Sequence, residues 1–212
     1  IWNFGDGSPA DTSASTAHTY TAVGTYTITL YALDSLGICV YLDSAKLVIT
    51  IGLPPTLQMA HSNPLCMGSS DGTASVVATG GYNPLTYSWS PNTQTSSVLT
   101  GLSAATYTVL VTDSVGCIST DTVTLLNPPQ LTGSVISTTS VTCFGGKDGS
   151  ATATGAGGTG TVTYSWNTTP VQTNATATGL APGIYVVTVT DASACTATAT
   201  VTIAPGQVVC NL

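Results

Sequence analysis

The sequence predicts an all-β fold of tandem β-sandwich modules, three in number, of which the first is incomplete. A seven-residue phrase built around a tyrosine occurs at residues 24–30, 105–111 and 183–189, and each copy is followed by an Asp and then a Cys. Short strand-forming runs recur at regular spacing with Gly and Pro between them, which is typical of sandwiches, and no helical period of useful length is present. An array of such units favours a structural role over catalysis.

Constant spacing identifies two copies of one module. Cysteines 66 and 143, aspartates 71 and 148, and tryptophans 89 and 166 are each separated by 77 residues. Tyrosines 107 and 185 and cysteines 117 and 195 are separated by 78, which indicates one inserted residue. The predicted divisions are a partial module at 1–51, full modules at 53–128 and 129–206, and at 207–212 the opening or donor strand of a further module.

The tyrosine strand of the second module shows which side chains face the core. Tyr107, Val109 and Val111 share one face of an alternating strand, and we expect this face to be buried. The threonines around them share the other face, with Leu110 as an exception. Leu102 is expected to fill the same core, and its spacing from Tyr107 resembles the tyrosine corner of Ig-like sandwiches. The modules are therefore predicted to be Ig-like.

Charge is scarce in this chain. It has two Lys, no Arg, nine Asp and no Glu, for a net charge of -7. This balance argues against nucleic acid and against anionic membranes as partners, since both attract Lys and Arg. No apolar run is long enough for membrane insertion, and no signal peptide is present, so we expect a processed or excerpted piece. Ser and Thr make up about 30% of the residues, and glycans or neighbouring subunits would supply the solubility that charge does not.

Six cysteines in a low-charge β array indicate disulfides and a location outside the cytosol. Each full module has one Cys before its first hairpin and one in its last hairpin, which predicts the pairs Cys66–Cys117 and Cys143–Cys195. The alternative is reduced, buried thiols. Cys39 has the late position of the first module, and we expect it to pair with Cys210 or a similar residue, within one subunit or between two.

The joints between modules are short and rich in proline. Gly52-Leu53-Pro54-Pro55 and Asn127-Pro128-Pro129 favour stiff, extended backbone. The first module begins at its own Trp, so its opening strands are missing, which would leave unpaired edges and an open core. Either the chain is cut from a longer repetitive protein, or the tail of one subunit completes the first module of its neighbour by strand addition.

Two family resemblances follow from these phrases. Residues 1–51 resemble the PKD domain through three phrases: Trp2-Asn3-Phe4-Gly5-Asp6-Gly7-Ser8, His18-Thr19-Tyr20 and Gly24-Thr25-Tyr26. Residues 53–206 look like two SprB-type repeats of gliding-bacterial surface adhesins, through Asp71-Gly72-Thr73-Ala74, Tyr87-Ser88-Trp89-Ser90 and Gly116-Cys117, and their counterparts around Asp148, Trp166 and Cys195. Ala194 stands where the pattern has Gly. The resemblance implies type IX secretion, a role in gliding motility or adhesion, a bacterial cell-surface location and no catalysis.

The remaining motifs have structural explanations. Trp2, Trp89 and Trp166 recur at one position of the repeat, where core packing is expected and a sugar-stacking platform is the alternative. The Asp-Gly pairs at 6, 71 and 148 are predicted turns, with calcium as the alternative, although each turn has only one carboxylate. His18 is expected to be hydrogen-bonded, and His61 has no partner in sequence. Two His and dispersed Asp form no zinc or catalytic set, so no catalytic residue, metal or cofactor is predicted.

The family resemblance also implies O-glycosylation. Secreted proteins of gliding bacteria carry sugars on Ser or Thr after Asp and before a small or aliphatic residue. Four positions fit this pattern: Ser35, Ser44, Ser114 and Thr122. Bulky sugars at these positions would keep the surface hydrated.

These observations predict an extracellular structural protein that forms a filament, fibre or adhesin stalk. Its partners would be copies of itself or further modules of a longer chain. The alternative is a cell-surface adhesin whose loops bind polysaccharide. A third class is an accessory segment of a secreted hydrolase.

Overall fold

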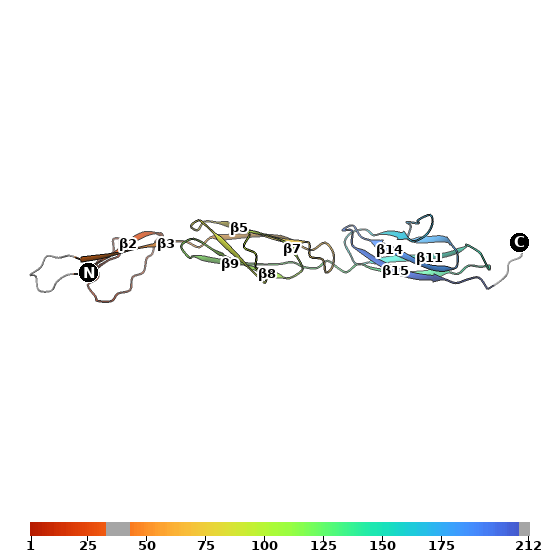
Figure 1. Cartoon of the computed structure of the whole chain (residues 1–212), viewed down its shortest axis with the longest axis horizontal. Coiled ribbons are helices and arrows are strands. Elements are labelled where there is room, and N and C mark those ends of the chain that lie inside the picture. Colours follow the sequence, from red (N-terminus) through yellow and green to blue (C-terminus); the bar gives the residue numbers. More distant parts are fainter. Residues whose placement is uncertain (33–42, 208–212) are drawn as a thin grey trace, which may run out of the picture. The chain divides into compact units, whose positions relative to one another are not determined.

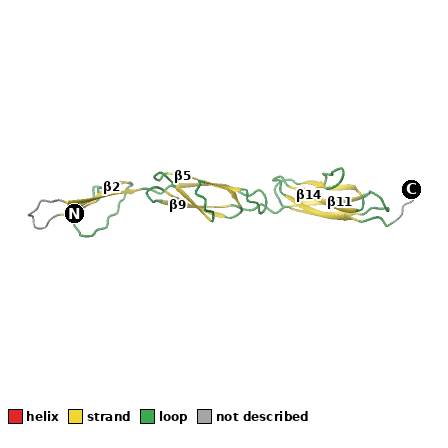
Figure 2. Ribbon diagram, in the orientation of Figure 1, coloured by secondary structure: helices red, strands yellow, loops and turns green. Residues whose placement is uncertain are grey.

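The computed structural model describes residues 1–32 and 43–207, and every regular element in these ranges is a β-strand (Figure 2). The strands are β1 (Trp2–Asn3), β2 (Gly24–Ala32), β3 (Asp43–Ile51), β4 (Thr56–Ser62), β5 (Gly72–Thr79), β6 (Thr86–Ser90), β7 (Val98–Leu102), β8 (Thr106–Thr112), β9 (Ile118–Thr124), β10 (Thr132–Thr139), β11 (Gly149–Ala156), β12 (Thr163–Trp166), β13 (Thr176–Leu180), β14 (Gly183–Thr190) and β15 (Thr196–Ile203). The predicted all-β class is confirmed. None of the described elements is a helix that could span a membrane.

The strands, some of which are labelled in Figure 1, form three-stranded sheets. Their orders are β1-β2-β3, β4-β5-β7, β6-β8-β9, β10-β11-β13 and β12-β14-β15. The chain divides into two compact units. One unit contains residues 1–60, 75–98 and 107–123, and the other contains residues 61–74, 99–106 and 124–212.

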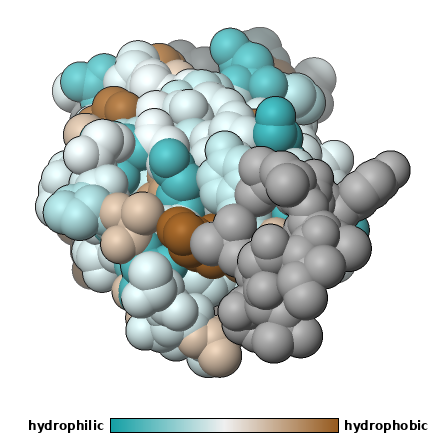
Figure 3. All heavy atoms as spheres, turned by 90° about the vertical axis from the view of Figure 1, so that its left-hand side faces the viewer, coloured by the Kyte–Doolittle hydropathy of each residue, from teal (hydrophilic) through white to brown (hydrophobic). Residues whose placement is uncertain are grey.

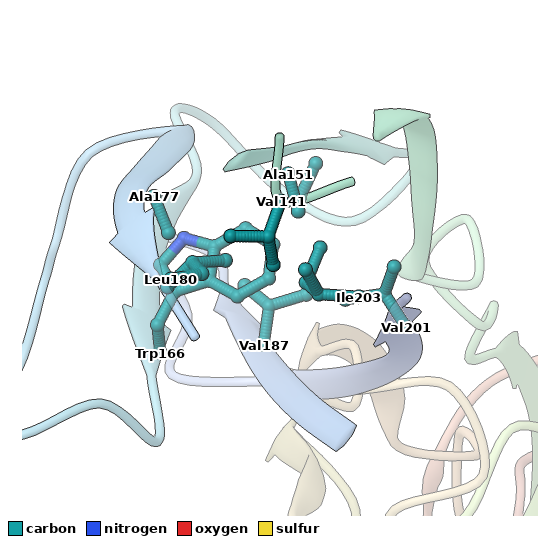
Figure 4. Close-up of a cluster of buried hydrophobic side chains, with 9 residues drawn as sticks. Val141, Ala151, Trp166, Ala177, Leu180, Val187, Val201 and Ile203 are labelled. Carbon is teal, nitrogen blue, oxygen red and sulfur yellow. The ribbon is translucent and has the colours of Figure 1, made fainter. Parts of the chain in front are cut away.

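The second unit contains a β-sandwich whose core lies between the sheets β10-β11-β13 and β12-β14-β15 (Figure 4). The first sheet contributes mainly small side chains, such as Ala151, Ala153 and Ala177, and the second contributes large ones. Trp166 is 1% exposed and Val187 is fully buried. Because small residues face large ones, the side chains of the two layers interdigitate. The alternation along each strand turns every second side chain into this core.

Register in the second sheet is regular along its whole length. Tyr185 pairs with Val201, and Gly183 pairs with Ile203. In the first sheet the pairing of β10 with β11 shifts between Val135 and Ser137, and Ile136 between them is exposed. A bulge of this kind bends a strand locally and leaves one residue outside the alternation.

The sheets β4-β5-β7 and β6-β8-β9 repeat the same strand orders. Tyr107, Val109 and Val111 are buried and Leu110 is exposed, as the alternation predicted. Leu102 is 2% exposed, which confirms its place in the core. The hydroxyl of Tyr185 donates to the carbonyl of Ala181, four residues upstream, at 3.1 Å. This hydrogen bond has the form of a tyrosine corner, whereas the corner predicted at Leu102 and Tyr107 stays a prediction.

In the sheet β1-β2-β3, the strands β2 and β3 pair in the same register as β14 and β15. Gly24 pairs with Ile51 and Tyr26 with Ile49, just as Gly183 pairs with Ile203 and Tyr185 with Val201. One face of this sheet carries Trp2, Tyr26, Ile28, Leu30, Ala45, Leu47 and Ile49, which we call the PKD-side apolar face. Leu47 on this face is 60% exposed. On the end view in Figure 3, apolar atoms reach the surface among mostly pale, weakly polar ones.

The tryptophans occupy two positions rather than one. Trp89 and Trp166 are buried, pair with Val109 and Val187, and so confirm the expected core packing. Trp2 pairs instead with Leu30. The residue of β2 that corresponds to Val109 and Val187 is Ile28, so the partner of Trp2 is displaced by two residues. The expectation of one common position is therefore wrong for Trp2, because β1 is only two residues long and is held by its bridge to Asp11 rather than by a full strand.

Candidate functional site

A disulfide joins Cys66 to Cys195, 129 residues apart in sequence, with a Cα–Cα distance of 5.6 Å. Cys66 follows β4 and Cys195 precedes β15. The predicted pairs Cys66–Cys117 and Cys143–Cys195 are therefore wrong. Cys117 is a free thiol, and Cys143 is disulfide-bonded but not to Cys195.

The length of β15 explains why Cys143 cannot reach Cys195. Cys143 lies against Gly206, beyond the end of β15, where a Cβ on Gly206 would be 2.8 Å from the Cα of Cys143. Cys195 lies just before the start of the same strand. Eight residues of strand span about 26 Å, whereas a disulfide needs Cα atoms within about 7 Å. The positions of cysteines within a repeat thus do not identify which cysteines form a disulfide.

The hairpin that carries Cys195 is built around a buried carboxylate. Oδ1 of Asp191 accepts hydrogen bonds from the amides of Ser193 and Cys195, both at 2.9 Å. Oδ2 accepts from the amide of Thr159 at 2.7 Å. Asp191 is 6% exposed, so these amides take the place of water around its charge. This arrangement fixes the position of the Cys195 backbone.

The hairpin of Cys117 repeats this arrangement bond by bond. Oδ1 of Asp113 accepts from the amides of Val115 at 3.0 Å and Cys117 at 2.8 Å, and Oδ2 accepts from the amide of Tyr82 at 3.0 Å. Asp113 is 5% exposed. The two hairpins therefore present their cysteines in the same way, although one thiol is bonded and the other is free.

Hydrogen bonding holds the pKa of both aspartates below the ordinary value. For Asp191 the bond from the Thr159 amide is the largest cause, and burial opposes it. For Asp113 burial is the largest single influence and acts to raise the pKa, but the amides of Tyr82, Cys117 and Val115 together outweigh it. Both groups therefore stay ionised and structural at neutral pH.

The two hairpins differ at the residue before the cysteine, which is Gly116 in one and Ala194 in the other. Gly116 has φ of +88°, and its counterpart Ala194 has φ of +64°. Ala194 is the position where the repeat pattern has Gly, and it occupies the left-handed region that a Cβ disfavours.

An open hollow of about 460 Å³ adjoins the disulfide. Its lining residues are Cys66, Met67, Gln130, Leu131, Ala194, Cys195 and Thr196. None of these side chains is an acid, a base or a free nucleophile, so the hollow holds no set of groups for acid–base or nucleophilic chemistry.

The turn at the start of the chain is organised by Asp6. Its carboxylate accepts from the amide and the hydroxyl of Ser8, and it lies 2.7 Å from Nε2 of His18. The Ser8 hydroxyl is the largest cause that holds the pKa of Asp6 far below its ordinary value, and His18 adds to it. The His18 ring stacks on Phe4 at a centroid distance of 4.0 Å. His18 is thus a hydrogen-bonded structural residue, as expected.

The other Asp-Gly pairs are also part of turns. Asp71 accepts from the Leu65 amide at 3.0 Å and from the Ser69 hydroxyl, and Asp148 accepts from the Thr142 amide at 3.1 Å. Within residues 1–32 and 43–207, no group of three or more His, Cys, Asp or Glu side chains could hold a metal ion.

Three of the predicted glycosylation positions lie on the surface. Ser44 is exposed on β3, Ser114 is exposed in the β8–β9 turn, and Thr122 is exposed on β9. Ser35, together with Cys39 and Cys210, lies outside the described residues. Exposure makes the three sites accessible to modification.

Comparison with known families matches residues 1–49 to the PKD domain and residues 60–94 and 135–170 to the SprB repeat. The chain carries a PKD domain and two SprB repeats. Both families are structural modules, and the two SprB matches make this chain a repeat protein. The free Cys117 and the bonded Cys195 lie beyond the two matched stretches, in the hairpin that ends each of the two modules.

Similar solved structures are Ig-type proteins. The structure titled "Structural basis for Dscam isoform specificity" is 16% identical with a TM-score of 0.32, and the match covers 85% of this chain and 54% of that chain. The structure of the eight N-terminal Ig domains of DSCAM is 15% identical with a TM-score of 0.37, and coverage is 85% of this chain and 28% of that chain. A C-terminal fragment of intimin in complex with the Tir intimin-binding domain is 14% identical with a TM-score of 0.31, at 86% and 58% coverage. This chain therefore spans less than two thirds of each, and no curated protein gives a significant match.

Proposed function

We propose that this chain is a structural segment of an extracellular filament or adhesin stalk on a bacterial surface, in which neighbouring copies join by completing each other's β-sheets. The observation that carries the proposal is the PKD-side apolar face, over which no described strand lies, although the Tyr20 ring stacks on Tyr26 at a centroid distance of 4.3 Å. The equivalent face in the second SprB repeat, on the sheet β12-β14-β15, is covered by the sheet β10-β11-β13.

Equivalent residues make the contrast quantitative. Ile28 and Leu30 correspond by register to Val187 and Val189, which are fully buried under the sheet β10-β11-β13. On the PKD sheet no described strand takes that place, and Leu47 is 60% exposed. A shallow hollow of about 180 Å³ lies over this face, lined by Trp2, Ile28, Leu30, Ala45, Lys46 and Leu47. An apolar sheet face of this kind is stabilised by a second β layer.

The chain itself supplies a segment of suitable sequence. In the second SprB repeat, Val141 of the phrase Val141-Thr142-Cys143 packs into the core with 3% exposure, and its amide donates to Ala204 at 3.3 Å. The tail phrase Val208-Val209-Cys210 has the same pattern of an apolar residue two positions before a cysteine. We propose that residues 207–212 of a second copy begin the layer that covers the PKD-side apolar face, by β-strand addition.

Two adjacent residues of β3 provide a matched test. Leu47 lies on the PKD-side apolar face, and Val48 lies on the opposite face with 62% exposure. Leu47→Lys would place a charge under the incoming layer, so we expect it to abolish polymers in negative-stain images and in size-exclusion chromatography. Val48→Lys should polymerise like the wild type. Monomeric wild-type protein, or equal polymers from both variants, would refute strand completion.

We further propose that surface glycans hydrate this weakly charged surface. Ser44, Ser114 and Thr122 are exposed on strand or turn backbone. Intact mass of the native material should exceed that of the polypeptide, and replacing Ser114 by Ala should remove one increment. A native mass equal to the bare polypeptide would end this proposal.

A further inference from the structure

We propose that the outer edge of β3 binds a strand that runs parallel to β3, and that this strand is an uncharged segment with the side-chain pattern of residues 131–141. The inference rests on the proposed completion of the PKD sheet. It adds the direction of the completing strand and the chemistry by which the edge recognises it.

The second SprB repeat contains the equivalent edge with its neighbouring strand in place. The carbonyl of Ala204, just after β15, accepts a hydrogen bond from the amide of Val141 at 3.3 Å. Near the start of β15, a Cβ on Gly133 would lie 3.7 Å from the carbonyl oxygen of Ala197. Residue numbers increase along both segments from one contact to the other, so β10 runs parallel to β15. Between the two contacts β10 has one residue more than β15, and the bulge at Ile136 accounts for it.

This geometry transfers to the PKD sheet through the shared register of β2–β3 and β14–β15. By that register Ala45 corresponds to Ala197, and Gly52 corresponds to Ala204. Among the described residues, β3 pairs with β2 alone and forms one edge of its sheet. An edge strand presents unpaired N–H and C=O groups to a further strand. We therefore expect the incoming strand to follow β3 from Ala45 to Gly52.

Burial along the two strands shows what the PKD edge lacks. Val201 and Ile203 of β15 are 8% and 1% exposed. Both lie with Val141 in one core cluster (Figure 4). Their equivalents on β3, Ile49 and Ile51, are only half-buried. A strand in the place of β10 would bury these apolar side chains further.

The approach of the strands decides which residue must be small. A Cβ on Gly133 would lie 3.0 Å from Cγ2 of Val189, so β10 passes too close to β14 for a side chain at this point. On the PKD sheet the larger Leu30 takes the place of Val189. The incoming strand therefore needs glycine where β10 has Gly133.

The other positions of the pattern are apolar inside and hydroxyl-bearing outside. Leu131 and Val141 are 8% and 3% exposed, and Val135 packs against the core. Ser and Thr occupy most of the exposed positions, and residues 131–141 carry no charge. A segment of this chemistry gains main-chain hydrogen bonds from the edge and burial from the apolar face.

The test adds a synthetic peptide of residues 131–141 to the whole chain. One version carries a photoreactive group at its N-terminus and the other carries it at its C-terminus. Binding measured by fluorescence anisotropy should be saturable. After irradiation, peptide mapping by mass spectrometry should place the N-terminal probe near Ala45 and the C-terminal probe near Gly52. The reverse placement would overturn the parallel direction.

A matched peptide and two chain variants test the recognition. The peptide with Gly133→Val should bind at least about tenfold more weakly, because its side chain would meet Leu30. Leu47→Lys in the chain should lose the peptide, and Val48→Lys should keep it. Equal affinities of the two peptides would overturn the glycine requirement. Cross-links confined to β15 would show exchange into the second repeat and overturn the site.

The outcomes separate this inference from the proposed function. A peptide that binds β3 as expected and suppresses polymers of the whole chain supports both. The same binding to a chain that stays monomeric without peptide supports this inference and overturns strand completion between copies. Polymers that form regardless of the peptide, with no cross-link to β3, overturn this inference and leave strand completion standing.

Discussion

Replacing Ala194 by Gly should stabilise the protein, although it removes a side chain. Ala194 has φ of +64° in the hairpin before Cys195. A left-handed backbone costs an L-residue about 1–2 kcal/mol that glycine does not incur. Glycine in turn gives the unfolded chain more freedom, which costs about 0.4–1 kcal/mol. The net expectation for Ala194→Gly is a gain of about 0.8 kcal/mol in the free energy of unfolding, measured by urea denaturation.

The first SprB repeat offers the reciprocal change. Gly116 has φ of +88°, and a Cβ placed there would meet no atom within 4 Å, so Gly116→Ala tests backbone conformation alone. It should lose about as much stability as Ala194→Gly gains, which is about 0.8 kcal/mol. A destabilised Ala194→Gly, or a neutral Gly116→Ala, would refute the claim that left-handed strain distinguishes these hairpins.

Three further expectations concern the core, the buried carboxylates and the disulfide. Trp166→Ala removes a side chain that is 1% exposed and should cost about 3–5 kcal/mol in urea denaturation; a loss under about 1 kcal/mol would place the ring outside the core. Asp191→Ala should lower the melting temperature more than Asp191→Asn, whose amide oxygen still accepts the Ser193 and Cys195 bonds, and equal values in calorimetry would contradict that role. Because the folded pKa of Asp113 and Asp191 is lowered, their contribution to stability is present above the unfolded pKa of about 3.9 and is lost as pH falls through the folded pKa; a pH titration of the melting temperature should show this acid limb weakened in the Asn variants. Reduction of Cys66–Cys195, with a separation of 129 residues, should cost about 5 kcal/mol in the loop-entropy estimate, and an unchanged urea midpoint would show that the bond constrains nothing.

Periodicity was sufficient to predict the strands and their buried faces. The alternation at Tyr107, Val109 and Val111 is a local property of the chain, because a strand turns every second side chain to the same side. The same holds for the tyrosine corner of Tyr185, whose partner is only four residues away. Such features depend on near neighbours, which the sequence lists in order.

The disulfide connectivity depended on distant neighbours and could not be predicted in this way. Alignment showed that Cys117 and Cys195 are equivalent, but it did not show which end of the sandwich each opening cysteine occupies. In the two full modules an Asp precedes the hairpin cysteine by four residues, as Asp113 precedes Cys117, and this spacing marks a turn whose carboxylate fixes the cysteine backbone. The offset of Trp2 was hidden for a similar reason, since it arises from a bridge to Asp11 rather than from a strand phrase.

The bond between Cys66 and Cys195 also decides how the chain would carry tension. Force applied to the two ends crosses one sulfur–sulfur link and bypasses the polypeptide between, a separation of 129 residues with its ends held 5.6 Å apart. Fully drawn out, that polypeptide would measure about 450 Å. In oxidised chains the polypeptide between Cys66 and Cys195 therefore adds no length under tension even if its strands separate, and those strands stay tethered close enough to pair again.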